Sequence, residues 1–356
     1  MEENTVDIIF SDGRKIYHPG GTVHGTVKLT VRDHIKFKEI LLKSRGKARV
    51  LWVEGGGKDT KVYYKKEKYI SEIKQLLHKE EGQKEDFTYQ QGGYNFPFSV
   101  KLPEEIPSSY HGSCGKILYD LEAVVVRPWA SNLSVRYPFT VLSVLNLSER
   151  PDVSRQMVAT NQKTVCCLCC ASGPITANIT TERQGYVPGE AIKFWAEIRN
   201  DSRRNIKYYK AKLIMRVAYD GGVKTKTVNY VLHKLRGKRL PAGRTDTWSG
   251  EKLLIPPFPP TFPQGSCIIQ INYFVTITAV LSGPAFNLEV LAEVIIGTIP
   301  IQKEGQPVPQ PDFKENEIIK GDGFAPLYPY YNLGRQRPRL TSKVSPSKKT
   351  YHLRSN

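Results

Sequence analysis

The stretch that decides the fold is YVPGEAIKFWAEIRN, residues 186–200. It begins with a tight turn, because Pro188 presets φ and Gly189 accepts a φ that other residues avoid. After the turn, apolar residues occupy every second position: Ile192, Phe194, Ala196 and Ile198. A period of two over this length predicts a β-strand with one buried face.

The same design occurs earlier in the chain, in YHPGGTVHGTVKLTV, residues 17–31. A second pair of landmarks is Gly-Ser-Cys, at 112–114 and 265–267, which each time follows a proline-containing loop and precedes an alternating run. Both landmarks recur in the same order, which indicates two copies of one domain. Short strands separated by Gly and Pro turns predict antiparallel sandwiches, so the expected fold class is all-β.

The length of 356 residues is enough for two domains that each bury a core. We place the first sandwich at 1–147 and the second at 165–301. Residues 148–164 lack periodicity and are predicted to be a linker or hinge. From Gln302 the hydrophobic periodicity stops and the end is rich in Lys and Arg, so 302–356 is predicted to be a disordered basic tail.

Composition narrows the function classes. No stretch approaches the roughly 20 apolar residues that span a bilayer, and the start, MEENTVDIIF, lacks the apolar core of a secretory signal. We therefore expect a cytoplasmic protein, in which Cys114 and Cys267 are small core residues rather than disulfide partners. The formal net charge of +18 predicts attraction to lipid headgroups, phosphorylated peptides or nucleic acid.

The strongest signal for a site is the run from Arg203 to Arg244, which holds thirteen Lys or Arg and one acid, Asp220. Alternation within 209–219 places three of its cations on the solvent face, and two more follow across a Gly-Gly turn. We expect these five to merge into one patch that binds anionic lipid or phosphorylated cargo: Lys210, Lys212, Arg216, Lys224 and Lys226. Each Lys or Arg near a membrane surface adds about 1 kcal/mol; a solvated charged face is the alternative.

The segment CCLCC is the second unusual feature, with cysteines at Cys166, Cys167, Cys169 and Cys170. Its Cys-x-x-Cys spacing suggests zinc, but four thiols on five consecutive residues are cramped for one tetrahedron, and no second ligand pair accompanies them. No βαβ pattern supports redox chemistry. S-acylation near a basic surface is the functional interpretation, and a thiol-rich first strand is the structural one.

Seven segments, in order along nearly all of residues 5–301, resemble the arrestin-domain-containing proteins, or α-arrestins: YHPGGTVHGTV (17–27), YNFPFSVKLPEEIPSS (94–109), GKILYDLEAVVVRPW (115–129), YPFTVLSVLNL (137–147), CCLCCASGPI (166–175), YVPGEAIKFWAEIRN (186–200) and LLIPPFPPTF with CIIQINYFV (253–275). The resemblance implies two consecutive arrestin-like, immunoglobulin-like antiparallel β-sandwiches. It also implies a cytoplasmic adaptor, peripheral to the plasma membrane and endosomes, that binds the cytoplasmic tails of receptors or transporters and promotes their endocytosis, endosomal sorting or ubiquitination.

The resemblance carries two finer expectations. In arrestins, basic residues near the first Tyr-x-Pro-Gly touch receptor phosphates, and Arg14 and Lys15 stand at about that position. Many α-arrestins recruit HECT-type ubiquitin ligases through Pro-Pro-x-Tyr motifs that dock into WW domains. The tail segment APLYPYY, residues 325–331, lacks this motif and offers only Leu-Tyr-Pro-Tyr as a weakened substitute.

Two other function classes remain to be weighed. A basic scaffold for nucleic acid or nuclear partners would use Tyr208, Tyr209, Tyr219 and Tyr230 as stacking groups among the cations, but their alternation with Lys places some in the core, so no specific nucleic acid is expected. An enzyme is not expected either. The histidines are scattered, no His-Glu-x-x-His occurs, and no residue set predicts a catalytic site, a metal or a cofactor.

Overall fold

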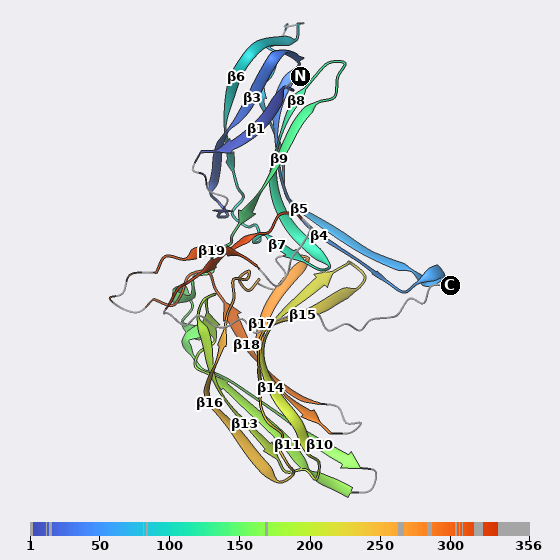
Figure 1. Ribbon diagram of the computed structural model, residues 1–356, viewed down its shortest axis with the longest axis vertical. Coiled ribbons are helices and arrows are strands. Elements are labelled where there is room, and N and C mark those ends of the chain that lie inside the picture. The colour runs from blue at the N-terminus through green and yellow to red at the C-terminus, as the bar shows by residue number, and fades with distance from the viewer. Residues whose placement is uncertain are drawn as a thin grey trace.

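The computed structural model describes residues 3–11, 13, 16–80, 82, 85–167, 170–262, 267–282, 287–302, 305, 307, 309–316 and 323–333. In this part the regular secondary structure consists of strands and three short 3-10 turns, η1 (Gly57–Asp59), η2 (Leu147–Glu149) and η3 (Pro151–Ser154). Two sandwiches lie one above the other along the long axis of the molecule (Figure 1). Within the described ranges, no helix has the length and apolar character that crossing a bilayer would need.

The first sandwich pairs a small sheet with a larger one. The small sheet has the strand order β1-β3-β6, formed by β1 (Thr5–Phe10), β3 (Thr22–Phe37) and β6 (Phe87–Lys101). The larger sheet has the order β2-β9-β8-β4-β5, with β7 attached to β8; its strands are β2 (Ile16–Tyr17), β4 (Glu39–Glu54), β5 (Lys61–Leu77), β7 (Tyr110–Gly112), β8 (Gly115–Val126) and β9 (Leu133–Val141). The long β4–β5 hairpin projects from the body (Figure 1).

The second sandwich has the same plan. One sheet has the order β10-β11-β13-β16, formed by β10 (Met157–Cys167), β11 (Cys170–Thr181), β13 (Ala191–Asn200) and β16 (Arg244–Leu254). The other has the order β12-β18-β17-β14-β15, formed by β12 (Gly185–Tyr186), β14 (Ile206–Asp220), β15 (Thr225–Arg236), β17 (Ile269–Leu281) and β18 (Leu288–Ile296).

The duplication predicted from the two landmarks is visible in the strand orders. The order β1-β3-β6 corresponds to β11-β13-β16, and β2-β9-β8-β4-β5 corresponds to β12-β18-β17-β14-β15. In each copy the tyrosine of Tyr-x-Pro-Gly ends a short strand that pairs in parallel with the last long strand of its sheet. The glycines Gly20 and Gly189 have φ of 73° and 97°, values that favour glycine. The prediction of two all-β sandwiches is confirmed.

Alternating residues supply the core, as the sequence predicts. Val23, Val27 and Leu29 are completely buried, as are Ile192 and Phe194 in the matching strand of the second sandwich. Burying such a side chain contributes roughly 2 kcal/mol. Most buried apolar residues of both sandwiches, together with the buried thiols Cys114 and Cys267, form one continuous cluster. The two domains therefore share a packed interface.

That interface joins equivalent hairpins of the two sandwiches. The β4–β5 hairpin lies along the end of the β14–β15 hairpin (Figure 1). Two ion pairs connect them, Lys65 Nζ to Asp220 Oδ2 at 2.5 Å and Lys224 Nζ to Glu54 Oε2 at 2.6 Å. Close approach is needed here, because a Cβ on Gly221 would lie 2.5 Å from the ring of Trp52.

The linker is shorter than predicted. Residues 157–164 belong to β10, which pairs in antiparallel register with β11. Sequence periodicity missed this strand because β10 is an edge strand, and its positions in 157–164 are exposed or only half-buried, so no apolar alternation is required. The connection between the sandwiches is therefore the pair of turns η2 and η3.

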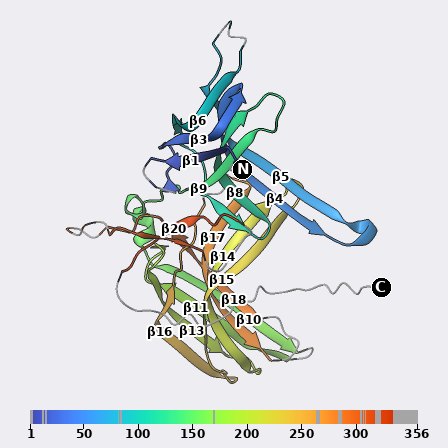
Figure 2. The same ribbon diagram turned by 45° about the horizontal axis from the view of Figure 1, so that its top comes forward.

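Part of the segment predicted as a tail is ordered. β19 (Asp312–Glu315) and β20 (Leu327–Tyr330) form a two-stranded sheet, and β20 lies between the two sandwiches (Figure 2). Tyr328 and Tyr331 are each only 2% exposed. The Tyr328 hydroxyl donates to the Ser109 carbonyl of the first sandwich at 3.1 Å, and the Tyr331 hydroxyl donates to the Thr298 carbonyl of the second at 2.6 Å.

Candidate functional site: a cationic strip on the second sandwich

The predicted basic strand lies within its sheet, and this position fixes the direction of its side chains. β14 pairs with both β15 and β17. The inward positions Tyr209, Ala211 and Leu213 are at most 2% exposed. Successive residues of a strand point to opposite faces, so Lys210 and Lys212 point outward, in agreement with the orientation that the sequence predicts.

The pairing register gathers further cations around these lysines. Lys210 lies opposite Arg236 of β15, and Lys212 lies opposite Lys234. Like charges directly opposite each other destabilise a sheet. The Arg236 guanidinium lies 4.0 Å from the centre of the Tyr208 ring, and this stacking holds it in place. The sequence run contained Lys234 and Arg236, but only the register shows that they face Lys210 and Lys212.

The electrostatic environment of Lys212 reflects this crowding. Burial lowers the pKa of its ammonium group, and the positive charges of Lys210 and Lys234 lower the pKa further, against an opposite effect of Glu289. A bound anion would relieve both the repulsion and the incomplete solvation of these groups. The cluster is therefore suited to holding a negatively charged ligand.

Arg216 extends the cluster along β14. Its Nε donates to Asn229 Oδ1 at 3.2 Å, and its guanidinium lies 4.5 Å from the centre of the Phe274 ring. It lies six positions after Lys210 along the strand, which corresponds to about 20 Å. We call this set the β14–β15 strip: Lys210, Lys212, Arg216, Lys234 and Arg236.

Lys224 and Lys226 do not belong to the strip, and that part of the prediction is wrong. Lys224 precedes β15 and pairs with Glu54 of the first sandwich. Lys226 lies opposite the buried Tyr219, and its Nζ is 6.0 Å from the centre of the Trp52 ring. The register pairs Asp220 with Thr225, so odd-numbered residues near the start of β15 share the outer face with even-numbered residues of β14. Both lysines therefore face the domain interface.

The other predicted site residues are the phosphate contacts Arg14 and Lys15 and the cysteines of CCLCC. Arg14, Lys15 and Cys169 lie outside the described residues. The backbones of Cys166, Cys167 and Cys170 belong to β10 and β11, with Cys167 opposite Cys170. S-acylation of this segment and phosphate contact by Arg14 and Lys15 remain predictions. In the part of the chain that the structure describes, no group of His, Cys, Asp or Glu could hold a metal ion.

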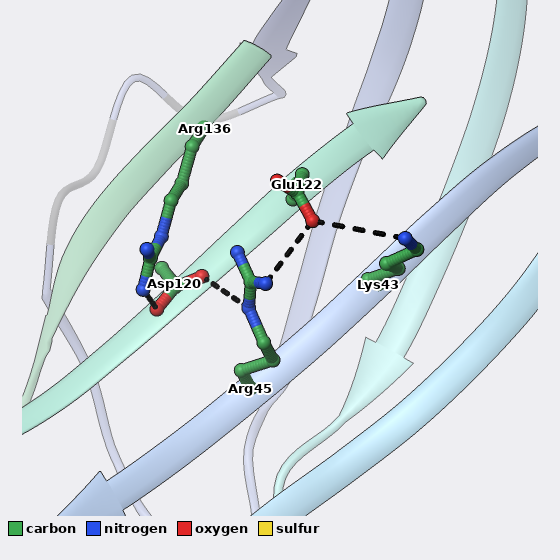
Figure 3. Close-up of polar contacts among 5 residues, drawn as sticks. All are labelled: Lys43, Arg45, Asp120, Glu122 and Arg136. Carbon is green, nitrogen blue, oxygen red and sulfur yellow. Dashed lines mark hydrogen bonds and ion pairs between the residues drawn. The ribbon is translucent and has the colours of Figure 1, made fainter. Parts of the chain in front are cut away.

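A charge network centred on the buried Asp120, which sequence reasoning missed, lies in the larger sheet of the first sandwich (Figure 3). Asp120 of β8 is 1% exposed and accepts hydrogen bonds from Arg45 Nε at 2.9 Å and Arg136 Nη2 at 2.5 Å. Glu122 lies 3.1 Å from Arg45 Nη1 and 4.0 Å from Lys43 Nζ. The hydrogen bond to Asp120 raises the pKa of Arg136. The network joins β4, β8 and β9.

Comparison with known proteins agrees with this architecture. Residues 6–148 match the family model of the arrestin (or S-antigen) N-terminal domain, and residues 171–301 match that of the C-terminal domain. The two sandwiches in this order therefore define a protein of the arrestin type.

Curated relatives narrow the class. Arrestin domain-containing protein 4 of Mus musculus is 32% identical over 310 residues, which cover 85% of this chain and 74% of the relative. The Homo sapiens protein of the same name is 31% identical over 303 residues, or 83% and 72% of the two chains. Arrestin domain-containing protein 1 of Mus musculus is 27% identical over 276 residues, or 76% and 60%. The chain belongs to the arrestin-domain-containing, or α-arrestin, family, as its motifs predict.

Proposed function

We propose that this α-arrestin is a non-catalytic adaptor in membrane-protein trafficking, and that its β14–β15 strip binds phosphate groups. The observation that carries the proposal is the double pairing of like charges, Lys210 with Arg236 and Lys212 with Lys234. Among the described residues, none of the ion pairs includes a member of the strip, although the Glu289 charge raises the pKa of Lys212. Since such pairs cost stability in the free protein, an anionic ligand explains the arrangement.

The chemistry of the strip suits phosphate. A guanidinium binds phosphate oxygens through paired hydrogen bonds, and ammonium groups add point charges. A phosphorylated side chain carries a charge of about −1.5 to −2 at neutral pH. Two phosphates on an extended peptide, or the headgroup of a phosphorylated lipid, both offer this chemistry. The strip therefore suits either a phosphorylated cytoplasmic tail or the inner membrane surface to which that tail is attached.

Membership of the α-arrestin family supports the wider role. In that role the protein acts in the cytoplasm, at the plasma membrane and endosomes, and directs bound membrane proteins to endocytosis, endosomal sorting or ubiquitination. The Leu-Tyr-Pro-Tyr segment is a poor site for a ubiquitin ligase in this conformation, because it forms β20 and buries Tyr328. We therefore propose that any HECT-type ligase is recruited through a third protein or after β20 detaches.

A nucleic-acid scaffold is the weaker candidate. Of its stacking tyrosines, Tyr209 and Tyr219 are buried in the sandwich, and only Tyr208 and Tyr230 are partly accessible. A stacking surface for single strands needs successive accessible aromatic rings. We expect RNA binding to be weak and abolished at physiological salt.

The test compares wild type with the double variant Lys210→Glu, Lys212→Glu. Three probes are used: a serine-phosphorylated peptide beside its unphosphorylated form, phosphatidylcholine vesicles with and without phosphatidylinositol bisphosphate, and single-stranded RNA. Loss of two cations alone should weaken phosphate binding roughly 30-fold, and reversal should weaken it further. The peptide and vesicle arms separate cargo from lipid.

The matched control is Lys193→Glu, Lys252→Glu, a single cross-strand pair on the opposite sheet of the same sandwich. It makes the same change in net charge at a site outside the strip. If both variants lose phosphate binding equally, the binding depends only on net charge, and the β14–β15 strip is not the phosphate site. Tightest binding to RNA at physiological salt would favour the scaffold instead.

A further inference from the structure

The outer face of the β4–β5 hairpin carries a row of basic residues that crosses several strands of the first sandwich. Lys66 of β5 lies opposite Arg49 of β4, Arg49 lies opposite Lys116 of β8, and Lys116 lies opposite His111 of β7. Residues directly opposite each other share a face and lie about 5 Å apart. Next to this row, Lys47 lies opposite Lys68. We call this set the hairpin row: Lys47, Arg49, Lys66, Lys68, Lys116 and His111.

The acids nearest to the row are already engaged. Asp120 binds Arg45 and Arg136, and Glu122 binds Arg45 and Lys43 (Figure 3). Among the described residues, none of the ion pairs includes a member of the row. Burial lowers the pKa of Lys47, and the charges of Arg136 and Lys66 lower it further, against an opposite effect of Asp120. The row is therefore a cationic surface whose nearest acids are shared with other cations.

Protection of a sheet edge explains only part of this row. β5 is an edge strand, and lysines on an edge discourage pairing with another chain. That explanation covers Lys66 and Lys68. It does not apply to Lys47 and Arg49, since β4 lies between β5 and β8, nor to Lys116, since β8 lies between β4 and β9.

Apolar side chains continue the same face toward the end of the hairpin. Leu51 lies opposite Tyr64, and Val53 lies opposite Val62. These four residues are 40%, 52%, 55% and 62% exposed, in that order. The inner face of the hairpin is occupied, because Trp52 and Tyr63 stack there 5.0 Å apart beside the second sandwich. The Arg49 guanidinium lies 5.7 Å from the centre of the Tyr64 ring, so the hairpin row and the outer apolar residues are in contact. Leu51, Val53 and Val62 are exposed beside this pair.

A hollow beside the row adds a possible position for a headgroup. It has a volume of about 220 Å³, and its lining includes Arg49, His111, Ser113 and Lys116. Its position between the row and Leu51 places a cationic recess next to exposed apolar surface. A phospholipid presents the same order of chemistry, an anionic group followed by hydrocarbon.

We propose that the outer face of the β4–β5 hairpin binds an anionic phospholipid bilayer, with the hairpin row at the headgroups and Leu51, Val53, Val62 and Tyr64 at the acyl boundary. Figures 1 and 2 both show the hairpin projecting from the body, where a planar surface can reach it. A bound peptide would more naturally fill a groove, and here the apolar residues are on a projection. The surface belongs to the other sandwich from the β14–β15 strip and does not depend on that strip's function.

The test is flotation of the full chain with vesicles of phosphatidylcholine alone or mixed with phosphatidylserine. Wild type should float only with the anionic vesicles. The double variant Lys66→Gln, Lys68→Gln should bind roughly 20- to 30-fold more weakly, since each cation near the surface contributes about 1 kcal/mol. The variant Val53→Ser, Val62→Ser should bind roughly 10-fold more weakly through lost apolar contact.

Matched controls carry the same chemical changes elsewhere. Lys28→Gln, Lys101→Gln removes two exposed lysines from the small sheet of the same sandwich, and Val144→Ser, Val158→Ser removes two exposed valines outside the hairpin. Both should float like wild type. Removing Lys66 and Lys68 relieves repulsion, so that variant should unfold at the same or a higher urea concentration than wild type, which excludes misfolding as the cause.

Contact with the acyl boundary has its own readout. The variant Val62→Trp should show blue-shifted fluorescence on anionic vesicles and quenching by brominated lipid. If the protein floats with the vesicles but shows neither the blue shift nor the quenching, the hairpin end does not reach the acyl boundary. If Lys28→Gln, Lys101→Gln loses as much flotation as Lys66→Gln, Lys68→Gln, the hairpin row is not the binding surface. Binding of a polyglutamate peptide that depends on Lys66 and Lys68, with no flotation, would assign this face to an acidic protein segment instead. Loss of flotation only in Lys210→Glu, Lys212→Glu would leave the β14–β15 strip as the membrane site.

Discussion

The hydroxyl of Tyr110 in the first sandwich lies 2.8 Å from the hydroxyl of Tyr219 in the second. Both side chains are at most 1% exposed, and burial raises the pKa of each well above 10.0. The Tyr219 hydroxyl also lies 3.3 Å from that of Tyr230, which in turn lies 2.7 Å from Ser113 Oγ. A chain of hydroxyl groups, buried at Tyr110 and Tyr219 and exposed at Ser113, therefore joins the two domains.

The first prediction concerns this pair. Tyr219→Phe removes one partner and leaves the Tyr110 hydroxyl buried without it, which should lower the free energy of unfolding by about 1–2 kcal/mol. Replacing both residues by Phe leaves neither hydroxyl unsatisfied, so the double variant should cost less than the sum of the single variants. Urea unfolding of all four proteins measures this coupling. Strict additivity would show that the two hydroxyls do not interact.

The second prediction concerns the network of Asp120. Asp120→Asn removes the carboxylate that separates the Arg45 and Arg136 guanidinium groups, and should destabilise the first sandwich by about 3 kcal/mol. Asp152→Asn is the control, because the Arg150–Asp152 pair is exposed and should leave stability unchanged. Thermal unfolding of the two variants checks the difference. Equal midpoints would mean that the buried carboxylate does not hold β4, β8 and β9 together.

The third prediction uses the repeated Pro-Gly turn. Gly20 and Gly189 both have positive φ, so Ala at either position should cost about 1 kcal/mol or more. Only at Gly189 does a Cβ collide with the segment that follows β20, since it would lie 2.1 Å from the Tyr331 carbonyl oxygen. At Gly20 the nearest atom is the flexible Glu104 side chain at 3.3 Å.

Gly189→Ala should therefore detach β20 from the interface, whereas Gly20→Ala should not. Limited proteolysis followed by mass spectrometry measures cleavage between 309 and 333 in each protein. Faster cleavage in Gly189→Ala alone is the expected result. If both variants are cleaved alike, Tyr331 does not depend on the turn at Gly189.

Most of the architecture could be predicted because it depends on local signals. Alternation after a Pro-Gly turn determines which face of a strand is buried, and it correctly orients Lys210 and Lys212. The error at Lys224 and Lys226 arose at the next step, since the face of β15 depends on how many residues turn the hairpin. The pairing register decides whether opposite or like charges face each other across two strands. The alternation of apolar and polar residues along one strand does not determine that register.

The docked β20 segment could not be predicted for a different reason. Tyr328 and Tyr331 are buried against Ser109 and Thr298, residues far away in sequence. A four-residue strand offers too few positions for periodicity to be recognised. The same holds for the hairpin row, whose members come from β4, β5, β7 and β8 and meet only in the folded sheet.

The fourth prediction is a pH dependence of the docked segment. Burial, with a smaller contribution from the Glu190 charge, raises the pKa of Tyr331 from 10.0 to about 12. The folded state thus holds the proton more tightly than the detached segment does. The free energy that the protonated Tyr331 hydroxyl contributes to docking of the segment is fully present below about pH 10. It is lost as the pH rises toward 12. Phe at this position cannot ionise and should remove this part of the pH dependence.

Ultraviolet difference titration tests this directly. The tyrosinate absorbance of wild type minus that of Tyr331→Phe should rise with a midpoint near 12. In the Gly189→Ala background, where the segment is expected to detach, the same difference should move to the ordinary tyrosine value of about 10. A wild-type midpoint of about 10 would mean that water reaches the Tyr331 hydroxyl, and that its hydrogen bond to the Thr298 carbonyl does not persist in solution.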